Sequence, residues 1–293
     1  MLRTAGDFLG MIRFSHTVFA LPFALLSALL AWQDVPIQWP HVVGILACMV
    51  LARSAAMAFN RLADRRLDAA NPRTAGRHLV TGQLSVAAVA LFTLLCSIGF
   101  IAATALFLLN DPPNWSPLFL SIPVLAFICA YSLTKRVTSL AHFWLGASLM
   151  LAPVSAWIAI RGIETMATPL VLGLAVLCWV SGFDILYACQ DVDFDVKAKV
   201  HSVPARFGVR ASLKIALACH LLMLAALVAL YVVSPHLGPV YLAGLALIAL
   251  LVVYEHWLVR PDDLTRVNRA FFQVNGVISI GLFVVVLIQV LVK

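Results

Sequence analysis

The feature of this sequence that most constrains its fold is a series of apolar runs, each long enough to cross a lipid bilayer as a helix. A membrane-spanning helix needs about 20 mostly apolar residues. Runs of this kind cover residues 15–33, 40–59, 84–109, 117–134, 138–160, 167–189, 211–233, 237–258 and 271–292. We therefore predict an all-α polytopic membrane protein. Its nine transmembrane helices form a single domain over residues 1–293 and surround a central cavity open to the cytoplasmic face.

The composition agrees with this class and argues against several others. Hydrophobic residues make up 63% of the chain and charged residues 11%, whereas a soluble domain carries roughly 25% charged residues. A net charge of +7 can indicate nucleic-acid binding, but the cations lie in short loops between the apolar runs, so we predict no nucleic-acid partner. The six cysteines lie singly within apolar runs, which favours neither a disulfide framework nor a zinc site.

The distribution of Lys and Arg predicts how the chain crosses the membrane. Cytoplasmic loops of membrane proteins are enriched in these residues. With nine spans and a cytoplasmic N-terminus, nearly all of the 20 lysines and arginines fall inside, Arg53 lies within a span, and only Arg161 and Lys293 fall outside. We expect a multi-pass protein of a bacterial-type inner (plasma) membrane, with cytoplasmic cap loops at about residues 60–83 and 190–210.

The segment 53–82 closes an apolar run and is the most polar part of the chain. Asn60, Asp64 and Asp68 are four residues apart, a spacing that stacks side chains on one face of a helix. Such oxygens suit Mg²⁺, which is usually held by one or two carboxylates together with substrate phosphates. Several cations that could hold those phosphates stand around them, namely Arg61, Arg65, Arg66, Arg73 and Arg77.

The segment 184–208 repeats this pattern. Asp191 and Asp195 are four apart, Asp184 lies seven before Asp191, and cations follow. A single such pair at a membrane surface is usually a solvated helix end. Two copies in a chain with 13 acidic residues instead indicate a shared site, so we expect the two motifs to face each other across one cavity.

The two motifs carry a resemblance. The segments NRLADRRLD, NPRTAGR and YACQDVDFD, together with SHTVFALPFALLSALLAW and YSLTKRVTSLAHFWLG, resemble the intramembrane aromatic prenyltransferases, the superfamily of 4-hydroxybenzoate polyprenyltransferase. The likeness runs over almost the whole chain. It implies Mg²⁺-dependent transfer of a polyprenyl group from polyprenyl diphosphate to an aromatic hydroxy acid, with formation of a C–C bond, in ubiquinone or menaquinone biosynthesis.

The acceptor is less defined than the reaction. The sequence as a whole most resembles the 4-hydroxybenzoate branch of the family, and a dihydroxynaphthoate of menaquinone synthesis is the alternative acceptor. An ion-coupled secondary transporter is the alternative class, but its paired acids would lie at helix breaks near the bilayer midplane. A CDP-alcohol phosphotransferase would need a DG-containing run that is absent here.

The resemblance also implies roles for individual residues. The family pattern NxxxDxxxD matches Asn60, Asp64 and Asp68, and a Tyr followed by DxxxD matches Tyr187, Asp191 and Asp195. We expect these five Asn and Asp side chains to bind Mg²⁺. The expected diphosphate ligands are Arg73, Arg77, Lys135, Arg136 and Lys197. His78 departs from the family, where many members have Pro, and we expect it to change the shape of the loop.

The remaining expectations concern catalysis and the acceptor. Asp184, Tyr187 and Asp191 are the expected catalytic residues, because Asp184 and Tyr187 lie one turn apart and could orient the acceptor hydroxyl or take up the ring proton. A charge inside the membrane marks function by default, so Arg53 is expected to pair with an acceptor carboxylate; an ion pair with Asp184 is the alternative. His142 is the second expected acceptor ligand. For His142 and His16 alike, a structural role is the alternative.

Overall fold

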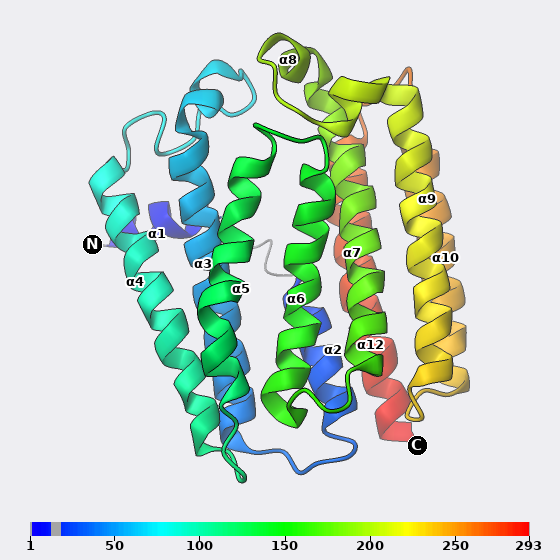
Figure 1. Ribbon diagram of the computed structural model, residues 1–293. Helices are drawn as coiled ribbons and strands as arrows, with labels where there is room; N and C mark the ends of the chain where they lie inside the picture. Colours follow the sequence, from blue (N-terminus) through cyan, green and yellow to red (C-terminus); the bar gives the residue numbers. More distant parts are fainter. Residues whose placement is uncertain (1, 13–18, 293) are drawn as a thin grey trace. The chain divides into compact units, whose positions relative to one another are not determined.

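The chain is described by a computed structural model that covers residues 2–12 and 19–292. Within this range all regular elements are helices, apart from one isolated bridge between Arg260 and Asp263 (Figure 1). Eight helices of the described residues are long and apolar enough to cross a membrane. The predicted all-α, multi-pass membrane class is therefore confirmed.

The eight long helices follow the predicted spans closely. They include α3 (Trp39–Ala70), α4 with η2 (Val86–Thr104, Ala105–Leu109), α5 (Ser116–Thr134), α6 (Ala141–Arg161), α7 (Ala167–Ala188), α9 (Val203–Val233), α10 (Pro239–Leu258) and α12 (Asn275–Val292), which is preceded by α11 (Val267–Arg269) and η4 (Ala270–Val274). The predicted first span, 15–33, contains the shorter apolar helix α2 (Leu21–Ala31). Residues 13–18, with His16, lie outside the described part of the chain.

Familiar local signals start these helices. Ser85 and Ser202 are the N-caps of α4 and α9, and their side-chain oxygens accept hydrogen bonds from the backbone N–H groups of residues 88 and 205. Pro stands in the first turn of α3, α9 and α10, where its missing N–H costs no helical hydrogen bond. The helix boundaries are thus encoded locally, before any packing between helices.

Helix α3 differs from the expectation in one useful way. The predicted span ends at residue 59 and the cap loop begins at 60, yet the helix continues to Ala70. The segment NRLADRRLDAA is rich in Leu, Ala and Arg, which are strong helix formers, so the helix outlasts the apolar run. It ends at Asn71, because a residue before proline is disfavoured in helical geometry. The first motif therefore lies on the same helix as the second predicted span.

The chain forms two compact units. The first contains residues 1–17 and 38–133. In it, α3 packs along α4 (Figure 1), and α1 (Leu2–Met11) joins them through a small apolar cluster that includes Met11, Leu79 and Val89. The rings of Phe8 and Phe92 stack with centroids 4.8 Å apart. This cluster fixes the loop that follows the first motif against the helices that carry it.

The second unit contains residues 18–37 and 134–293. Helix α7 runs between α6 and α9 and is the most buried of the long helices (Figure 1). Helix α2 packs on α6, where the Ser27 hydroxyl donates to the Pro153 carbonyl at 2.7 Å. The core of this unit is large and aromatic, with Trp179 only 1% exposed. The single-domain organisation over residues 1–293 stays a prediction.

Candidate active site

The side chains of the first motif lie along one face of α3. The amide Nδ2 of Asn60 donates to Oδ2 of Asp64 at 3.0 Å, so the four-residue spacing brings the two residues together as expected. Asp64 is 1% exposed and Asp68 is 6% exposed. Carboxylates this buried need nearby polar or positive partners, and the structure supplies them from two sides.

The first partner set orients Asn60. Its Nδ2 also lies 3.3 Å from the Ser132 hydroxyl, and its Oδ1 accepts from the guanidinium Nη1 of Arg61 at 3.3 Å. Arg61 is buried and also donates through Nε to the Met11 carbonyl. The sequence places Arg61 among the cations that could hold phosphate and gives no signal for Ser132. The structure instead makes both of them supports for the asparagine of the motif.

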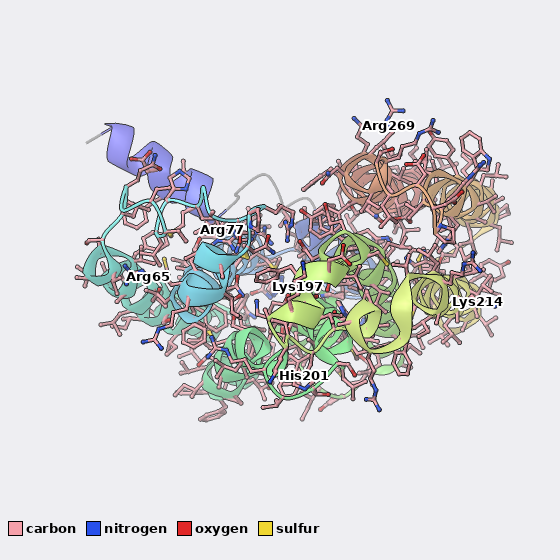
Figure 2. The ribbon with its side chains drawn as sticks, turned by 90° about the horizontal axis from the view of Figure 1, so that it is seen from above. Arg65, Arg77, Lys197, His201, Lys214 and Arg269 are labelled. Atoms are coloured by element: carbon pink, nitrogen blue, oxygen red, sulfur yellow. The ribbon has the colours of Figure 1, made fainter. Side chains whose placement is uncertain are left out.

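The second partner set folds the loop after α3 back onto Asp68. Arg77 Nη1 lies 2.6 Å from Asp68 Oδ1, and the Thr74 hydroxyl donates to the Asp68 carbonyl at 3.0 Å. The turn itself is closed by Asn71, whose Oδ1 accepts from the Arg73 backbone at 2.9 Å. Arg73 and Arg65 are exposed; Figure 2 labels Arg65 and Arg77 in this unit. Arg77 thus has a fixed position at the motif.

The first motif fits a magnesium ion whose coordination is completed by substrate. Among the residues that the structure describes, no group of three or more His, Cys, Asp or Glu side chains forms a metal site. Mg²⁺ is commonly bound through one or two carboxylates with substrate phosphates and water as the other ligands. The buried carboxylates of Asp64 and Asp68, beside Asn60, provide such an incomplete set.

The second motif is not carried by one continuous helix. Asp184 and Tyr187 lie on α7, Asp191 ends the 3₁₀ turn η3 (Cys189–Asp191), and Asp195 lies on the short helix α8 (Val192–Lys197). Asp191 has φ −103° and ψ 6°, in the sparsely populated bridge region where many active-site residues sit. The expected stacking of a four-residue spacing on a regular helix therefore applies to the first motif and is interrupted in the second.

His142 links Asp184 to the start of α9. Its Nδ1 lies 2.7 Å from Asp184 Oδ2, and its Nε2 accepts from the Val203 backbone N–H at 3.3 Å. Because a backbone N–H can only donate, Nε2 carries no proton, and the proton of the neutral ring is on Nδ1. His142 therefore donates to the Asp184 carboxylate. Both ring nitrogens have protein partners, a fact that the sequence did not reveal.

The cap that follows the second motif is tied to the loop before α6. The His201 backbone donates to the Lys135 carbonyl at 2.8 Å, and Arg206 Nη1 lies 3.3 Å from the Ser139 hydroxyl. These contacts, with that of His142, hold residues 198–206 beside residues 135–142. Figure 2 labels Lys197, His201, Lys214 and Arg269 in this unit. Lys197 and Arg136 are exposed there, and Lys135 is half-buried.

Two aromatic rings, Phe271 and Phe272, pack against Tyr187. The ring centroids of Phe271 and Phe272 lie 4.2 Å and 6.2 Å from that of Tyr187. Phe271 also contacts Phe183 and Phe19, at 5.2 Å and 5.5 Å. The sequence signal that could have revealed this cluster is the Phe271–Phe272 pair at the start of the last span. These rings provide a wall without hydrogen-bonding groups beside the polar motif.

Arg53 lies on α3 seven residues before Asn60, as the sequence requires, and its side chain is half-buried. Nothing in the structure tests its expected contact with an acceptor. The assignments of metal-binding, diphosphate-binding, catalytic and acceptor-binding residues therefore stay predictions, now with known local surroundings.

Comparison with known proteins identifies relatives over most of the chain. A sequence model described as the UbiA prenyltransferase family matches residues 20–277. The chain is 34% identical over 263 residues to a 4-hydroxybenzoate octaprenyltransferase from Tolumonas auensis, covering 86% of this chain and 88% of the relative. It is 32% identical over 288 residues to one from Pseudomonas fluorescens, covering 97% and 94%.

Solved structures show the same fold. A UbiA homologue from Aeropyrum pernix, in its apo structure, has a TM-score of 0.79 and 29% identity, covering 95% of this chain and 98% of the other. A homologue from Archaeoglobus fulgidus, solved with DMAPP and Mg²⁺ bound, has a TM-score of 0.71 and 18% identity, covering 98% and 100%. The resemblance that the two aspartate motifs carry is confirmed by these matches.

Proposed function

Because the chain belongs to the UbiA prenyltransferase family, and is thus a polyprenyltransferase embedded in a membrane, we propose that it transfers a polyprenyl group from polyprenyl diphosphate to 4-hydroxybenzoate. The choice of acceptor is supported by relatives at 34% and 32% identity that bear the name 4-hydroxybenzoate octaprenyltransferase. The product would be a precursor of ubiquinone. The observation that carries the proposal is the pair of aspartate motifs at the ends of two apolar helices.

We assign the diphosphate of the donor to these motifs, with Mg²⁺ held by Asn60, Asp64, Asp68, Asp191 and Asp195. When bound, the ion would neutralise the negative charge that develops on the leaving diphosphate. On the protein side, Arg61 holds the orientation of Asn60. Arg77 brings a positive charge to the carboxylate of Asp68, from where its guanidinium can also contact phosphate oxygens.

The expected reaction replaces a C–O bond of the donor and a C–H bond of the acceptor ring with a new C–C bond, and releases diphosphate and a proton. The C–O bond between the first prenyl carbon and the diphosphate breaks, and its electron pair leaves with the diphosphate. A ring carbon of the acceptor supplies the pair for the new C–C bond, and the ring then loses one proton. The apolar wall formed by Phe19, Phe183, Phe271 and Phe272 would keep water from the allylic cation.

We propose that Asp184 takes up the ring proton and that Tyr187 orients the acceptor hydroxyl. His142 supports this role by donating to Asp184 Oδ2, which fixes one carboxylate oxygen and leaves the other for the substrate. In this proposal His142, expected from the sequence to be a direct acceptor ligand, acts on the acceptor through Asp184. Arg53 remains the proposed partner of the acceptor carboxylate, because a guanidinium matches the geometry of a carboxylate.

Orientation in the membrane is part of the proposal. The excess of Lys and Arg in alternate loops supports a cytoplasmic N-terminus and motifs that open to the cytoplasm of a bacterial-type cell. A prenyl diphosphate would then place its charged head at the cytoplasmic surface and its tail in the hydrocarbon. Protease protection of tags placed at Pro113 and at Lys199 in right-side-out vesicles tests this orientation, with only the Pro113 site expected to be accessible.

A transfer assay tests the function directly. Purified protein in lipid vesicles receives Mg²⁺, a labelled polyprenyl diphosphate and, in separate reactions, 4-hydroxybenzoate or a dihydroxynaphthoate. We expect a prenylated 4-hydroxybenzoate that disappears with EDTA and in the variants Asp64→Ala and Asp191→Ala. Arg65→Ala, which changes an exposed cation of the same helix, is the matched control and should retain transfer.

Other outcomes are equally informative. Product with the dihydroxynaphthoate alone would replace the proposed acceptor while keeping the reaction class. Normal turnover by both aspartate variants would refute the assignment of the metal ligands. Absence of product with either aromatic acid, in protein shown to be folded, would overturn the proposed acceptor class.

A further inference from the structure

The last membrane helix begins with a π-turn. Residues Ala270–Val274 form a π-helix between α11 and α12. This geometry is rare, occurs mostly as single turns within α-helices, and often marks functional sites. Here it carries Phe271 and Phe272, two consecutive residues whose rings both contact Tyr187. The turn is therefore the element that brings this part of the aromatic wall to the proposed active site.

Asn275 closes this turn with both its backbone and its side chain. Its backbone N–H and its side-chain Nδ2 both donate to the Ala270 carbonyl, the second at 3.1 Å. Nδ2 also donates to Glu255 Oε1 at 2.6 Å, and Oδ1 accepts from the indole Nε1 of Trp179 at 2.7 Å. Because an indole N–H can only donate, the orientation of the amide is fixed.

The surroundings make this arrangement rigid. Asn275 and Glu255 are 0% exposed and Trp179 is 1% exposed, so water does not compete for these hydrogen bonds. Trp179 itself packs against Phe183 and Phe19, with ring centroids 4.9 Å and 6.3 Å away. Asn275 thus contacts the π-turn directly and, on its other side, Trp179, which packs against the aromatic wall. Asn275, Glu255 and Trp179 lie on α12, α10 and α7 of the same unit.

A second set of polar side chains, Glu255, His220 and His256, lies beside Asn275. Glu255 Oε2 has no hydrogen-bond partner among the described residues and lies 3.7 Å from His220 Nδ1, which in turn is 2.9 Å from His256 Nε2. The described residues here form no metal site. Glu255 Oε1 accepts the hydrogen bond of Asn275 Nδ2, a contact that needs an acceptor oxygen at this position.

We propose that Asn275 is a positioning residue for the transfer reaction. By closing the π-turn Ala270–Val274, it holds the Phe271 ring against Tyr187 and keeps Tyr187 oriented toward the aromatic acceptor. This inference rests on the proposed function, since Tyr187 matters for turnover only if an aromatic acceptor binds there. A small displacement of an orienting group is enough to slow catalysis without altering the binding of the prenyl donor.

The test compares variants that remove either the side chain that closes the π-turn, the ring that this turn positions, or a side chain outside both. Asn275→Ala removes the side-chain closure, and Phe271→Leu removes the ring that the closure positions. Gln289→Ala is the matched control, because Gln289 is a buried amide of the same helix that accepts from the Tyr241 backbone at 3.1 Å, far from the π-turn. Glu255→Gln keeps an acceptor for Asn275 and removes the acid.

We expect Asn275→Ala and Phe271→Leu each to raise the KM for the aromatic acceptor, or to lower kcat, by about tenfold at an unchanged KM for the prenyl diphosphate. The double variant should be no worse than Phe271→Leu alone, because both act through one contact. Phe271→Tyr, which keeps the ring, should restore most activity. Glu255→Gln and Gln289→Ala should retain near-normal acceptor kinetics. Additive losses, or an equal loss in Gln289→Ala, would refute the inference.

A second measurement needs no activity. Hydrogen exchange of the backbone amides of residues 270–276, followed by mass spectrometry, should be faster in Asn275→Ala than in Gln289→Ala. Unchanged exchange would overturn the inference even if transfer were observed. Faster exchange in a protein that transfers nothing to any aromatic acid would instead contradict the proposed function and leave the role of Asn275 in closing the turn intact.

Discussion

His142 Nδ1 donates a hydrogen bond of 2.7 Å to Asp184 Oδ2, and the opposite nitrogen of the same ring accepts from Val203 at the start of α9. One imidazole thus joins α6, α7 and the end of the cap. Its exposed side-chain fraction is 7% and that of Asp184 is 18%, so the aspartate remains open on one side while the histidine is enclosed.

From this contact we predict that His142→Ala lowers kcat by about tenfold to a hundredfold, because Asp184 loses its orientation as a proton acceptor. The KM for the prenyl diphosphate should not change. His142→Asn, whose amide can replace the Nδ1 donor, should recover part of the rate. Steady-state kinetics with each substrate varied in turn provide the measurement; a larger change in the prenyl diphosphate KM than in kcat would contradict it.

The ion pair between Arg77 and Asp68 leads to a second prediction. Arg77→Ala removes a charge-assisted contact at the first motif and should raise the KM for the prenyl diphosphate by about tenfold. The acceptor KM should stay within experimental error. Arg65→Ala is the control, since Arg65 is an exposed cation on α3, the helix that carries Asp68. Equal effects of the two variants would show that net charge, rather than the position of Arg77, is what matters.

Arg53 gives a third prediction, for the acceptor. Arg53→Ala should raise the KM for 4-hydroxybenzoate by about tenfold to a hundredfold and leave the prenyl diphosphate KM unchanged. Arg53→Lys should be intermediate, because an ammonium keeps the charge but not the two-pronged geometry. Methyl 4-hydroxybenzoate, which lacks the carboxylate charge, should not discriminate between wild type and Arg53→Ala. A lower KM of the wild-type protein for the methyl ester than for 4-hydroxybenzoate itself would contradict the proposed contact.

A fourth prediction concerns stability at the opposite end of the second unit. Asp34 is paired with Arg161 and, at 2.9 Å, with His236. Partial burial raises the pKa of the Asp34 carboxyl, but the hydrogen bond of Arg161 and the charge of His236 outweigh it, so the pKa lies below its usual value. The stabilisation is therefore present above the pKa of an unfolded Asp, about 3.9, and is lost as the pH falls through the lower, folded pKa.

Because the Asp34 side chain is 40% exposed, solvent screens this pair, and Asp34→Asn should cost less than about 1 kcal/mol at pH 7. Thermal unfolding in detergent between pH 7 and pH 3 measures it. The difference between wild type and variant should shrink toward the acid end, while transfer activity at pH 7 stays normal. A difference that grows on acidification would contradict the sign of the pKa shift.

Much of the fold was predictable because hydropathy is a signal carried by the linear sequence. The start of α10 at Pro239 and the end of α5 at Thr134 lie within two residues of their predicted positions, since a run of apolar residues needs no partner to be recognised. Helix α3 continues to Ala70, beyond the predicted membrane span 40–59, because helix propensity persists after the apolar run ends and until Pro72 disfavours helical geometry.

The candidate site was predictable only in its chemistry. The spacing of Asn60 and Asp64 predicted their contact correctly, because an α-helix converts that spacing into proximity. The hydrogen bonds of His142 and Asn275 depend on partners distant in sequence: Val203 for His142, and Trp179 and Glu255 for Asn275. No periodicity within one segment carries that information.

The length of helix α3 has a consequence for how prenyl tails of different lengths would be bound. Its 32 residues at about 1.5 Å per residue give a rod of about 48 Å, longer than the roughly 30 Å of bilayer hydrocarbon. Asn60, Asp64 and Asp68 lie at fixed positions along this helix, so their distance from its apolar part is fixed as well. A diphosphate held there would start every prenyl tail at the same depth, whether the tail were short or long. Selection for tail length would then have to occur elsewhere, at the depth where the distal end of the tail meets protein side chains.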